Sequence, residues 1–302
     1  MRAPRHEDAE AVVTLMRACD VVVFGEPETD IKDVRDDWAA PGFELARDGW
    51  IIDREDGTAL GFAWIHARRP GSDFDGALYV LPGEPMDPIA PVLLGAVQAR
   101  AREKASEPGA TLCFFVAQVE AEMRSLLERF GYQEARTFFR MRIDLEGLEL
   151  PRSRATGIEI RPHRLGTDDR VTHAAIEESF AEHFRHTPRA FDDWWALRSR
   201  HERFDPGLWL LAWDREQVAG ALVAFDYGDA GFVRELGVLK PWRGKGVGSA
   251  LLLRSFEEFR SRGQPRVILG VDAENESAIV LYERVGMRVD GRHYLMRRPV
   301  GA

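Results

Sequence analysis

The stretch from Phe232 to Glu258 most constrains what this chain can fold into. It opens with the apolar residues Phe232-Val233 and Leu236 to Leu239, which together have the length expected for one buried strand. Pro241 then ends sheet pairing, because proline has no N–H group to donate. A basic, glycine-rich loop follows, and apolar residues return at helical spacing from Ala250 to Phe259. The sequence therefore predicts a strand, a glycine-rich loop and a helix, in that order.

The predicted loop has the chemistry of a phosphate site. The first N–H groups of a helix have no partner within the helix and lie at the positive end of its dipole. Glycine lets the backbone approach an anion closely, because it has no Cβ. Arg243 and Lys245 add positive charge. For the loop alone, a glycine-rich turn with solvated basic residues is the alternative interpretation.

Two common phosphate motifs do not match this loop. A P-loop requires Gly-Lys followed by Ser or Thr, and that triplet is missing here. A dinucleotide-binding fingerprint requires GxGxxG directly after the strand, whereas Lys240 to Arg243 intervene here. The pattern that fits is RxxGxG at Arg243, Gly246 and Gly248. It resembles the acyl-CoA pyrophosphate loop of the GNAT superfamily of N-acetyltransferases.

A second stretch downstream carries the same resemblance. The predicted strand Val267 to Val271 is followed by Asp-Ala-Glu-Asn, then by Leu-Tyr-Glu-Arg and Gly286. This order is similar to the second GNAT signature, in which an Asn contacts the pantetheine arm and a Tyr reaches the thioester sulfur. The resemblance implies these roles for Asn275 and Tyr282. The alternatives are a helix-start residue for Asn275 and a core aromatic for Tyr282.

The resemblance implies an α/β (α+β) fold, with a mixed, mostly antiparallel sheet flanked by helices. It also implies acetyl transfer from acetyl-CoA to an amine. In the family, the fourth and fifth strands splay apart and the pantetheine pairs with the fourth strand. A backbone N–H near Leu236 to Val238 would then polarise the thioester carbonyl. The acetyl-CoA-binding residues implied in this way are Leu236, Gly237, Val238, Arg243, Gly244, Lys245, Gly246, Val247, Gly248, Ser249, Asn275 and Tyr282.

Glu235 is the candidate general base. A carboxylate inside an apolar strand is costly unless it is paired or functional. An amine arrives protonated and only its neutral form attacks, so the reaction needs a base. Alternation along the strand puts Glu235 and Gly237 on one face. We predict Glu235 as the base and Tyr282 as the acid that protonates the departing thiolate, with a structural salt bridge of Glu235 as the alternative.

The order of elements occurs twice along the chain. Leu127 to Gly131 parallels Tyr282 to Gly286, and Phe138 to Arg142 parallels His293 to Arg297. The resemblance covers the second half well and the first half only in outline. We therefore predict two tandem GNAT-like domains, at 1–146 and 158–302, with a charged, Pro- and Gly-containing linker at 147–157.

The first of these domains lacks the predicted equipment and is expected to be non-catalytic. Ala77 stands where Glu235 stands, and Leu127 aligns with Tyr282. The loop is replaced by Pro82 to Pro85, whose Glu84 would repel a pyrophosphate. Tandem pairs with one degenerate half are similar in architecture to the mycothiol synthases, which acetylate the amine of a cysteinyl-glucosamine-inositol conjugate. No residue here specifies that acceptor, so aminoglycosides, polyamines and small amino metabolites stay open.

Composition narrows the partners. The net charge of −9 and the pI of about 5.5 argue against a general nucleic-acid or anionic-membrane binder. No apolar run reaches the roughly 18 residues of a membrane span, and the N-terminus lacks the apolar stretch of a signal peptide. The two cysteines indicate neither a disulfide framework nor a metal site. We expect a cytoplasmic protein.

The expected partners are acetyl-CoA and a small-molecule amine acceptor, with no metal, no nucleic acid and no membrane. We expect a monomer whose two halves form an intramolecular pseudo-dimer. A different class of function is a non-catalytic acyl-CoA sensor or regulatory module. A pure binder needs the phosphate loop but neither Glu235 nor Tyr282, so the presence of all three favours an enzyme.

Overall fold

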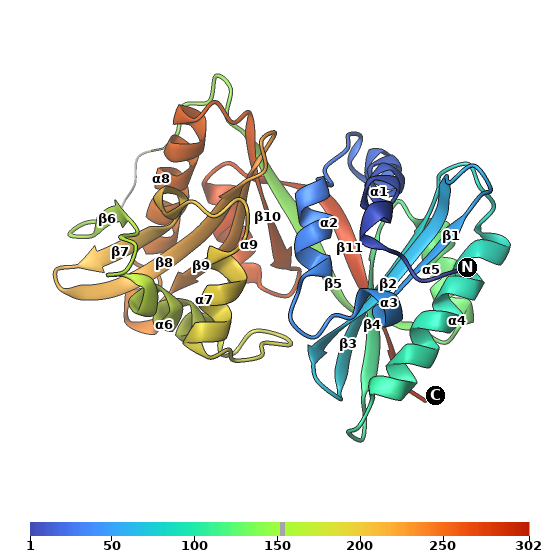
Figure 1. Ribbon diagram of the computed structural model, residues 1–302. Coiled ribbons are helices and arrows are strands. Elements are labelled where there is room, and N and C mark those ends of the chain that lie inside the picture. Colours follow the sequence, from blue (N-terminus) through green and yellow to red (C-terminus); the bar gives the residue numbers. More distant parts are fainter. Residues whose placement is uncertain (152–154, 302) are drawn as a thin grey trace. The chain divides into compact units, whose positions relative to one another are not determined.

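The computed structural model describes residues 1–151 and 155–301, which form two compact units (Figure 1). Unit 1 comprises Met1–Phe138 together with the chain from Gly291 onwards, and unit 2 comprises Phe139–Asp290. The predicted α/β class with a mostly antiparallel sheet is confirmed. Residues 152–154 of the predicted linker 147–157 lie outside the described residues.

The last strand of each sequence half extends from its own unit into the unit formed by the other half. Strand β11 (Arg288–Pro299) enters unit 1 and pairs antiparallel with β4 (Thr111–Ala117). Strand β5 (Gln133–Asp144) enters unit 2, where its neighbour is β10 (Arg266–Asp272). The boundaries at 146 and 158 describe the sequence repeat and stay a prediction, whereas each final strand crosses from one compact unit into the other.

Unit 1 is a sheet covered on both faces by helices, with the strand order β1-β2-β3-β4-β11. On β2, Phe62 packs with α1 and α2, whereas Ala63 and Ile65 face α4 and α5, which lie on the opposite side. Its remaining elements are η1 (His6–Asp8), α1 (Ala9–Phe24), α2 (Ile31–Trp38), α3 (Leu45–Asp48), β1 (Gly49–Asp53), β2 (Ala59–Arg69), β3 (Asp73–Val80), α4 (Met86–Lys104) and α5 (Ala121–Arg129).

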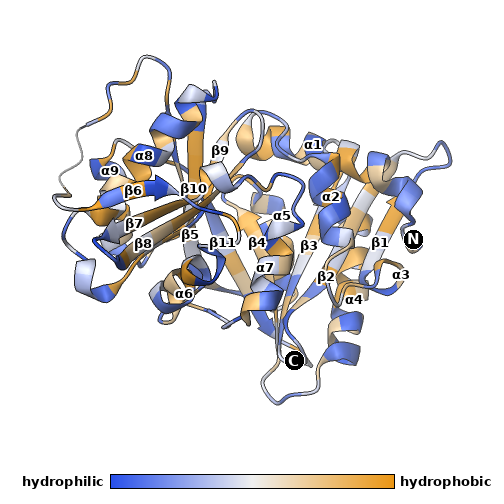
Figure 2. Cartoon of the chain, turned by 60° about the vertical axis from the view of Figure 1, so that its left-hand side comes forward, coloured by the Kyte–Doolittle hydropathy of each residue, from blue (hydrophilic) through white to orange (hydrophobic). Residues whose placement is uncertain are grey.

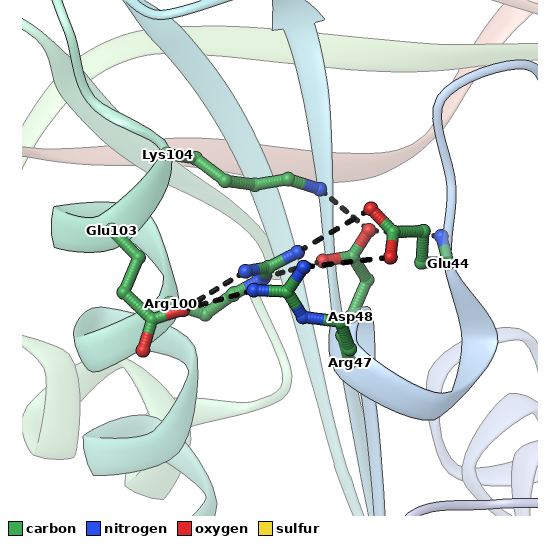
Figure 3. Close-up of polar contacts among 6 residues, drawn as sticks. All are labelled: Glu44, Arg47, Asp48, Arg100, Glu103 and Lys104. Carbon is green, nitrogen blue, oxygen red and sulfur yellow. Dashed lines mark hydrogen bonds and ion pairs between the residues drawn. The ribbon is translucent and has the colours of Figure 1, made fainter.

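A buried ion cluster ties α3 to α4 in unit 1 (Figure 3). The Asp48 side chain is fully buried and accepts from Arg100 Nε at 2.8 Å and from Lys104 Nζ at 2.5 Å. The backbone N–H of Glu44 donates to its second oxygen at 3.0 Å. Burial alone would raise the pKa of Asp48, but these hydrogen bonds outweigh burial and lower that pKa. The cluster therefore stabilises the short α3 helix, which is too short to be stable by itself.

Unit 2 has the strand order β5-β10-β9-β8-β7-β6. All its neighbouring strands from β6 to β9 pair antiparallel, and β9 pairs parallel with β10. Its other elements are β6 (Glu159–Pro162), α6 (Asp169–Phe180), α7 (Phe191–Ser199), η2 (Pro206–Leu208), β7 (Leu210–Asp214), β8 (Gln217–Asp226), β9 (Gly231–Val238), η3 (Lys240–Trp242), α8 (Val247–Ser261) and α9 (Glu276–Arg284).

The core of unit 2 packs its central strands against α8 and also against α6 and α7. Figure 2 shows the hydrophobic colouring concentrated along β8 and β10. Every residue of β8 from Ala219 to Phe225 is buried, as are Phe256 and Phe259 of α8. A Cβ on Gly231 would lie 2.6 Å from the Phe259 ring, so glycine there lets α8 pack directly on β9. The predicted strand and helix around the glycine-rich loop are both confirmed.

In the described part of the chain, no helix combines the length and the apolar character that a membrane span requires.

Candidate active site

Strands β9 and β10 separate within unit 2. Their parallel pairing covers only Gly231 with Val267 and Phe232 with Ile268. On its other side, β9 stays paired with β8 as far as Val238. Within the described residues, the backbone of β9 beyond Phe232 therefore faces an opening rather than a strand. This is the separation of the fourth and fifth strands that the family resemblance implies.

A β-bulge orients β9 at this opening. Val223 of β8 pairs with Glu235 and Ala224 pairs with Val233, so Arg234 is the extra residue. Glu235 and Gly237 then face α6 and α7, as alternation predicts. A Cβ on Gly237 would lie 2.7 Å from the buried side chain of Ser179 on α6. Glycine at this position therefore lets α6 pack close to the strand that borders the opening.

The glycine-rich loop connects η3 to α8. Gly244 and Gly246 have left-handed φ angles of 76° and 83°, and Gly246 is the N-cap of α8. No described residue accepts a hydrogen bond from the backbone N–H groups of Val247, Gly248 or Ser249. These donors lie at the positive end of the α8 dipole, and the exposed side chain of Lys245 adds charge. The loop thus fits an anionic group such as a pyrophosphate.

Two residues of the RxxGxG pattern also have structural contacts. Arg243 Nε donates to the carbonyl oxygen of Val238 at 3.0 Å, which links the loop to the end of β9. A Cβ on Gly248 would lie 2.9 Å from Leu281 Cδ2, so glycine there allows α8 to approach α9. Both residues therefore support the geometry of the loop in addition to any contact with a phosphate.

Asn275 is the N-cap of α9. Its Oδ1 accepts from the Ala278 N–H at 3.2 Å and from Ser277 Oγ at 3.0 Å. This is the helix-start role that the sequence allowed as an alternative. The side-chain NH2 group of Asn275 makes no hydrogen bond to a described residue, so its two donors are available to a ligand.

Tyr282 lies on α9 and belongs to the core of unit 2, with 8% of its surface exposed. Burial raises the pKa of Tyr282 to about 12, so its hydroxyl is protonated at neutral pH. A protonated hydroxyl can donate a proton or a hydrogen bond but cannot act as a base. Tyr282 is therefore a core aromatic residue whose hydroxyl group can still donate a proton.

Glu235 is ion-paired. Its Oε1 is in close contact with one terminal nitrogen of Arg198, and its Oε2 accepts from Arg198 Nε at 3.3 Å. Arg198 comes from α7 and is 4% exposed. Burial lowers the pKa of Arg198, and the opposite charge of Glu235 acts against that shift. The sequence had left a salt bridge open, but its partner lies 37 residues earlier and no motif indicated it.

The loop after α6 lies near the charged groups of the glycine-rich loop. Burial, together with the charges of His186 and Arg243, lowers the pKa of His183. His186 Nε2 lies 3.2 Å from a carboxylate oxygen of Glu177.

Among the described residues, no group of three or more His, Cys, Asp or Glu side chains is arranged so that it could hold a metal ion.

In unit 1, strands β3 and β4 separate as β9 and β10 do in unit 2, but the segment before α4 does not resemble the glycine-rich loop before α8. Strands β3 and β4 pair in parallel only as far as Gly76 with Phe114. Beyond that point the Cys19 thiol donates to the Val80 carbonyl at 3.4 Å, and burial raises the pKa of Cys19 to about 12. The position before α4 carries Glu84, which is paired with Arg54 at 2.6 Å.

Known proteins match both the sequence and the fold. Residues 169–287 match the model of the acetyltransferase (GNAT) family. A mycothiol acetyltransferase from Geodermatophilus obscurus is 28% identical over 285 residues, or 91% of this chain and 89% of that protein. A mycothiol acetyltransferase from Kineococcus radiotolerans is 31% identical over 254 residues, or 78% of this chain and 77% of that protein.

Solved structures agree with these sequence matches. A GCN5-related N-acetyltransferase from Sphaerobacter thermophilus has 30% identity and a TM-score of 0.81, covering 99% of this chain and 95% of that one. A tandem GNAT protein from the clavulanic acid biosynthesis pathway has 14% identity and a TM-score of 0.78, covering 100% and 98%, and supports the fold alone. The chain therefore belongs to the GNAT family of acetyl-CoA-dependent N-acetyltransferases.

Proposed function

We propose that this protein transfers an acetyl group from acetyl-CoA to the primary amine of a small molecule, at the opening between β9 and β10 of unit 2. The observation that carries this proposal is that β9 has no β10 partner among the described residues beyond Phe232 and leads at Val238 to the uncovered N-terminus of α8. Strand β9 offers an unpaired edge, and the N-terminus of α8 offers N–H donors for an anion. Acyl-CoA has a matching extended amide arm and a pyrophosphate.

The residues present fit acetyl-CoA, which supplies the acyl thioester when bound. The N–H groups of Val247, Gly248 and Ser249, with the charges of Arg243 and Lys245, would hold the pyrophosphate. Gly244 and Gly246 would keep the loop in the conformation that presents those donors. The backbone of Leu236, Gly237 and Val238 and the side-chain NH2 group of Asn275 would hold the pantetheine arm.

Transfer forms a C–N bond and breaks the C–S bond. The ammonium group of the acceptor loses one proton before attack and a second as the amide forms. We propose that Glu235 accepts one proton from the amine, directly or through water, that Tyr282 gives a proton to the departing thiolate, and that the second amine proton returns to Tyr282. A thiolate is already a fair leaving group, so proton removal from the amine should contribute more to the rate.

A second candidate function is an acyl-CoA sensor, and the ion pair is the observation that favours it. Both oxygens of Glu235 contact Arg198, so the carboxylate has a structural partner that accounts for its position without a catalytic role. Turnover decides between the two functions, because a sensor binds the thioester without releasing the thiol.

The test is a screen of amines with acetyl-CoA, read by release of free thiol. The names of the relatives favour the cysteinyl-glucosaminyl-inositol amine as one acceptor, and the panel should also hold aminoglycosides, polyamines and small amino metabolites. We expect thiol release that depends on one class of amine and that is strongly reduced in Glu235→Gln. Binding of acetyl-CoA with no release for any amine would support the sensor and contradict the proposal.

A further inference from the structure

Arg198 holds Glu235 from the buried side of the site. The guanidinium contacts both carboxylate oxygens in a forked arrangement, and such paired contacts fix direction as well as distance. The Arg198 side chain is 5% exposed and that of Glu235 is 15% exposed. The guanidinium therefore lies behind the carboxylate, and the carboxylate lies on the more open side.

The guanidinium is itself fixed within unit 2. Its remaining terminal nitrogen donates to the carbonyl oxygen of Trp194, one helical turn earlier, at 3.4 Å. Its central carbon lies 4.5 Å from the centre of the Trp194 ring. Trp194 is 1% exposed and packs edge-on against Trp209 at 5.6 Å. The core thus determines where the Arg198 fork points, and the fork determines where the carboxylate points.

Each carboxylate oxygen can accept more than one hydrogen bond, so pairing with Arg198 leaves acceptor capacity on the open side. From this geometry we infer that Arg198 is a positioning residue for acetyl transfer: it holds the Glu235 carboxylate aimed at the acceptor amine. The inference rests on the proposed function and adds a residue to it. Without Arg198, the Glu235 side chain gains rotamers that turn the carboxylate away from the amine.

The test compares Arg198→Met with Arg198→Lys in steady-state kinetics with the accepted amine. Arg198→Met should lower kcat by about 10²-fold, the scale of a misplaced reacting group. Arg198→Lys keeps the charge but loses the fork, so it should recover about a tenth of the wild-type kcat. The KM for acetyl-CoA should stay within about twofold in both variants, because neither change touches the phosphate loop.

A double variant separates positioning from folding. If Arg198 acts through Glu235, adding Arg198→Met to Glu235→Gln should lower kcat by less than about twofold further. A full second loss in that background would show a general structural effect and overturn the inference. Wild-type kcat in either Arg198 single variant would overturn it as well.

Arg161→Met is the matched control. Arg161 also forms a forked ion pair with a buried carboxylate of unit 2, donating to Asp168 at 2.6 and 3.0 Å. Its removal should cost comparable stability in a thermal melt while kcat stays unchanged. A wild-type protein that acetylates no amine would contradict the proposed function, whereas turnover that Arg198→Met leaves intact would contradict only the role of Arg198.

Discussion

Gly246→Ala and Gly83→Ala are a matched pair that tests where the acyl donor binds. Gly246 has a φ of 83° in the loop before α8, and Gly83 has a φ of 93° in the loop before α4. A Cβ at Gly83 would meet no atom within 4 Å. Both substitutions place a side chain at a left-handed φ, which costs about 1–2 kcal/mol for alanine.

Only one of the two should affect binding. In Gly246→Ala the free loop relaxes out of the left-handed conformation, and the donor must restore it on binding. The Kd for acetyl-CoA should then rise by about 5- to 30-fold, which is the strain converted to an equilibrium constant. In Gly83→Ala the Kd should not change, because the loop before α4 carries Glu84, which is ion-paired with Arg54 and would repel a pyrophosphate.

Titration calorimetry with acetyl-CoA gives the Kd, and scanning calorimetry checks that both variants lose similar stability. An unchanged Kd in Gly246→Ala would refute the assignment of the phosphate site to the α8 loop. A comparable rise in Gly83→Ala would refute the claim that unit 1 does not take part in donor binding.

Three further predictions address the charge, the chemistry and the stability. Arg243→Ala should weaken acetyl-CoA binding by about 1–3 kcal/mol, the range for hydrogen bonds to a charged group, and calorimetry that finds the wild-type Kd would contradict this. Glu235→Gln should lower kcat by about 10²–10⁴-fold, and Tyr282→Phe should lower kcat by a smaller factor. The loss in Tyr282→Phe should be smaller still with an acyl donor whose thiol is more acidic. Full activity in Tyr282→Phe would show that Tyr282 is only a core residue. Hydrogen bonds from basic partners outweigh burial and lower the pKa of Asp48 in the folded protein. The stability that Asp48 gives the fold is therefore complete above the ordinary Asp pKa of about 4, and it is lost as the pH falls through the folded-state pKa. Urea unfolding of the wild type should therefore weaken more steeply below about pH 4 than unfolding of Asp48→Asn, and parallel curves would count against the cluster.

The local part of the site could be predicted from the sequence. Apolar spacing, Pro241 and the glycines together determine β9, the loop and α8, because each signal acts over a few neighbouring residues. Asn275 could be placed at a helix start for the same reason, but the pattern did not distinguish a cap from a ligand contact.

The tertiary part could not be predicted. Arg198 reaches Glu235 across 37 residues, and nothing in the α7 sequence distinguishes it from a surface arginine. The crossing of β5 and β11 from one unit into the other is also invisible, because equivalent strands of a repeat carry the same pattern. Either strand satisfies either sheet, so only the fold shows which unit each strand completes.

Hydrogen exchange with and without acetyl-CoA tests the central claim most directly, namely that unit 2 binds the donor through the α8 loop and the edge of β9. The account predicts slower exchange at the backbone N–H groups of residues 246–249 and 236–238 when acetyl-CoA is added. It predicts no change at Gly83, Glu84 or the first turn of α4. Slower exchange at that unit 1 segment, or no change at 246–249 under saturating acetyl-CoA, would contradict it.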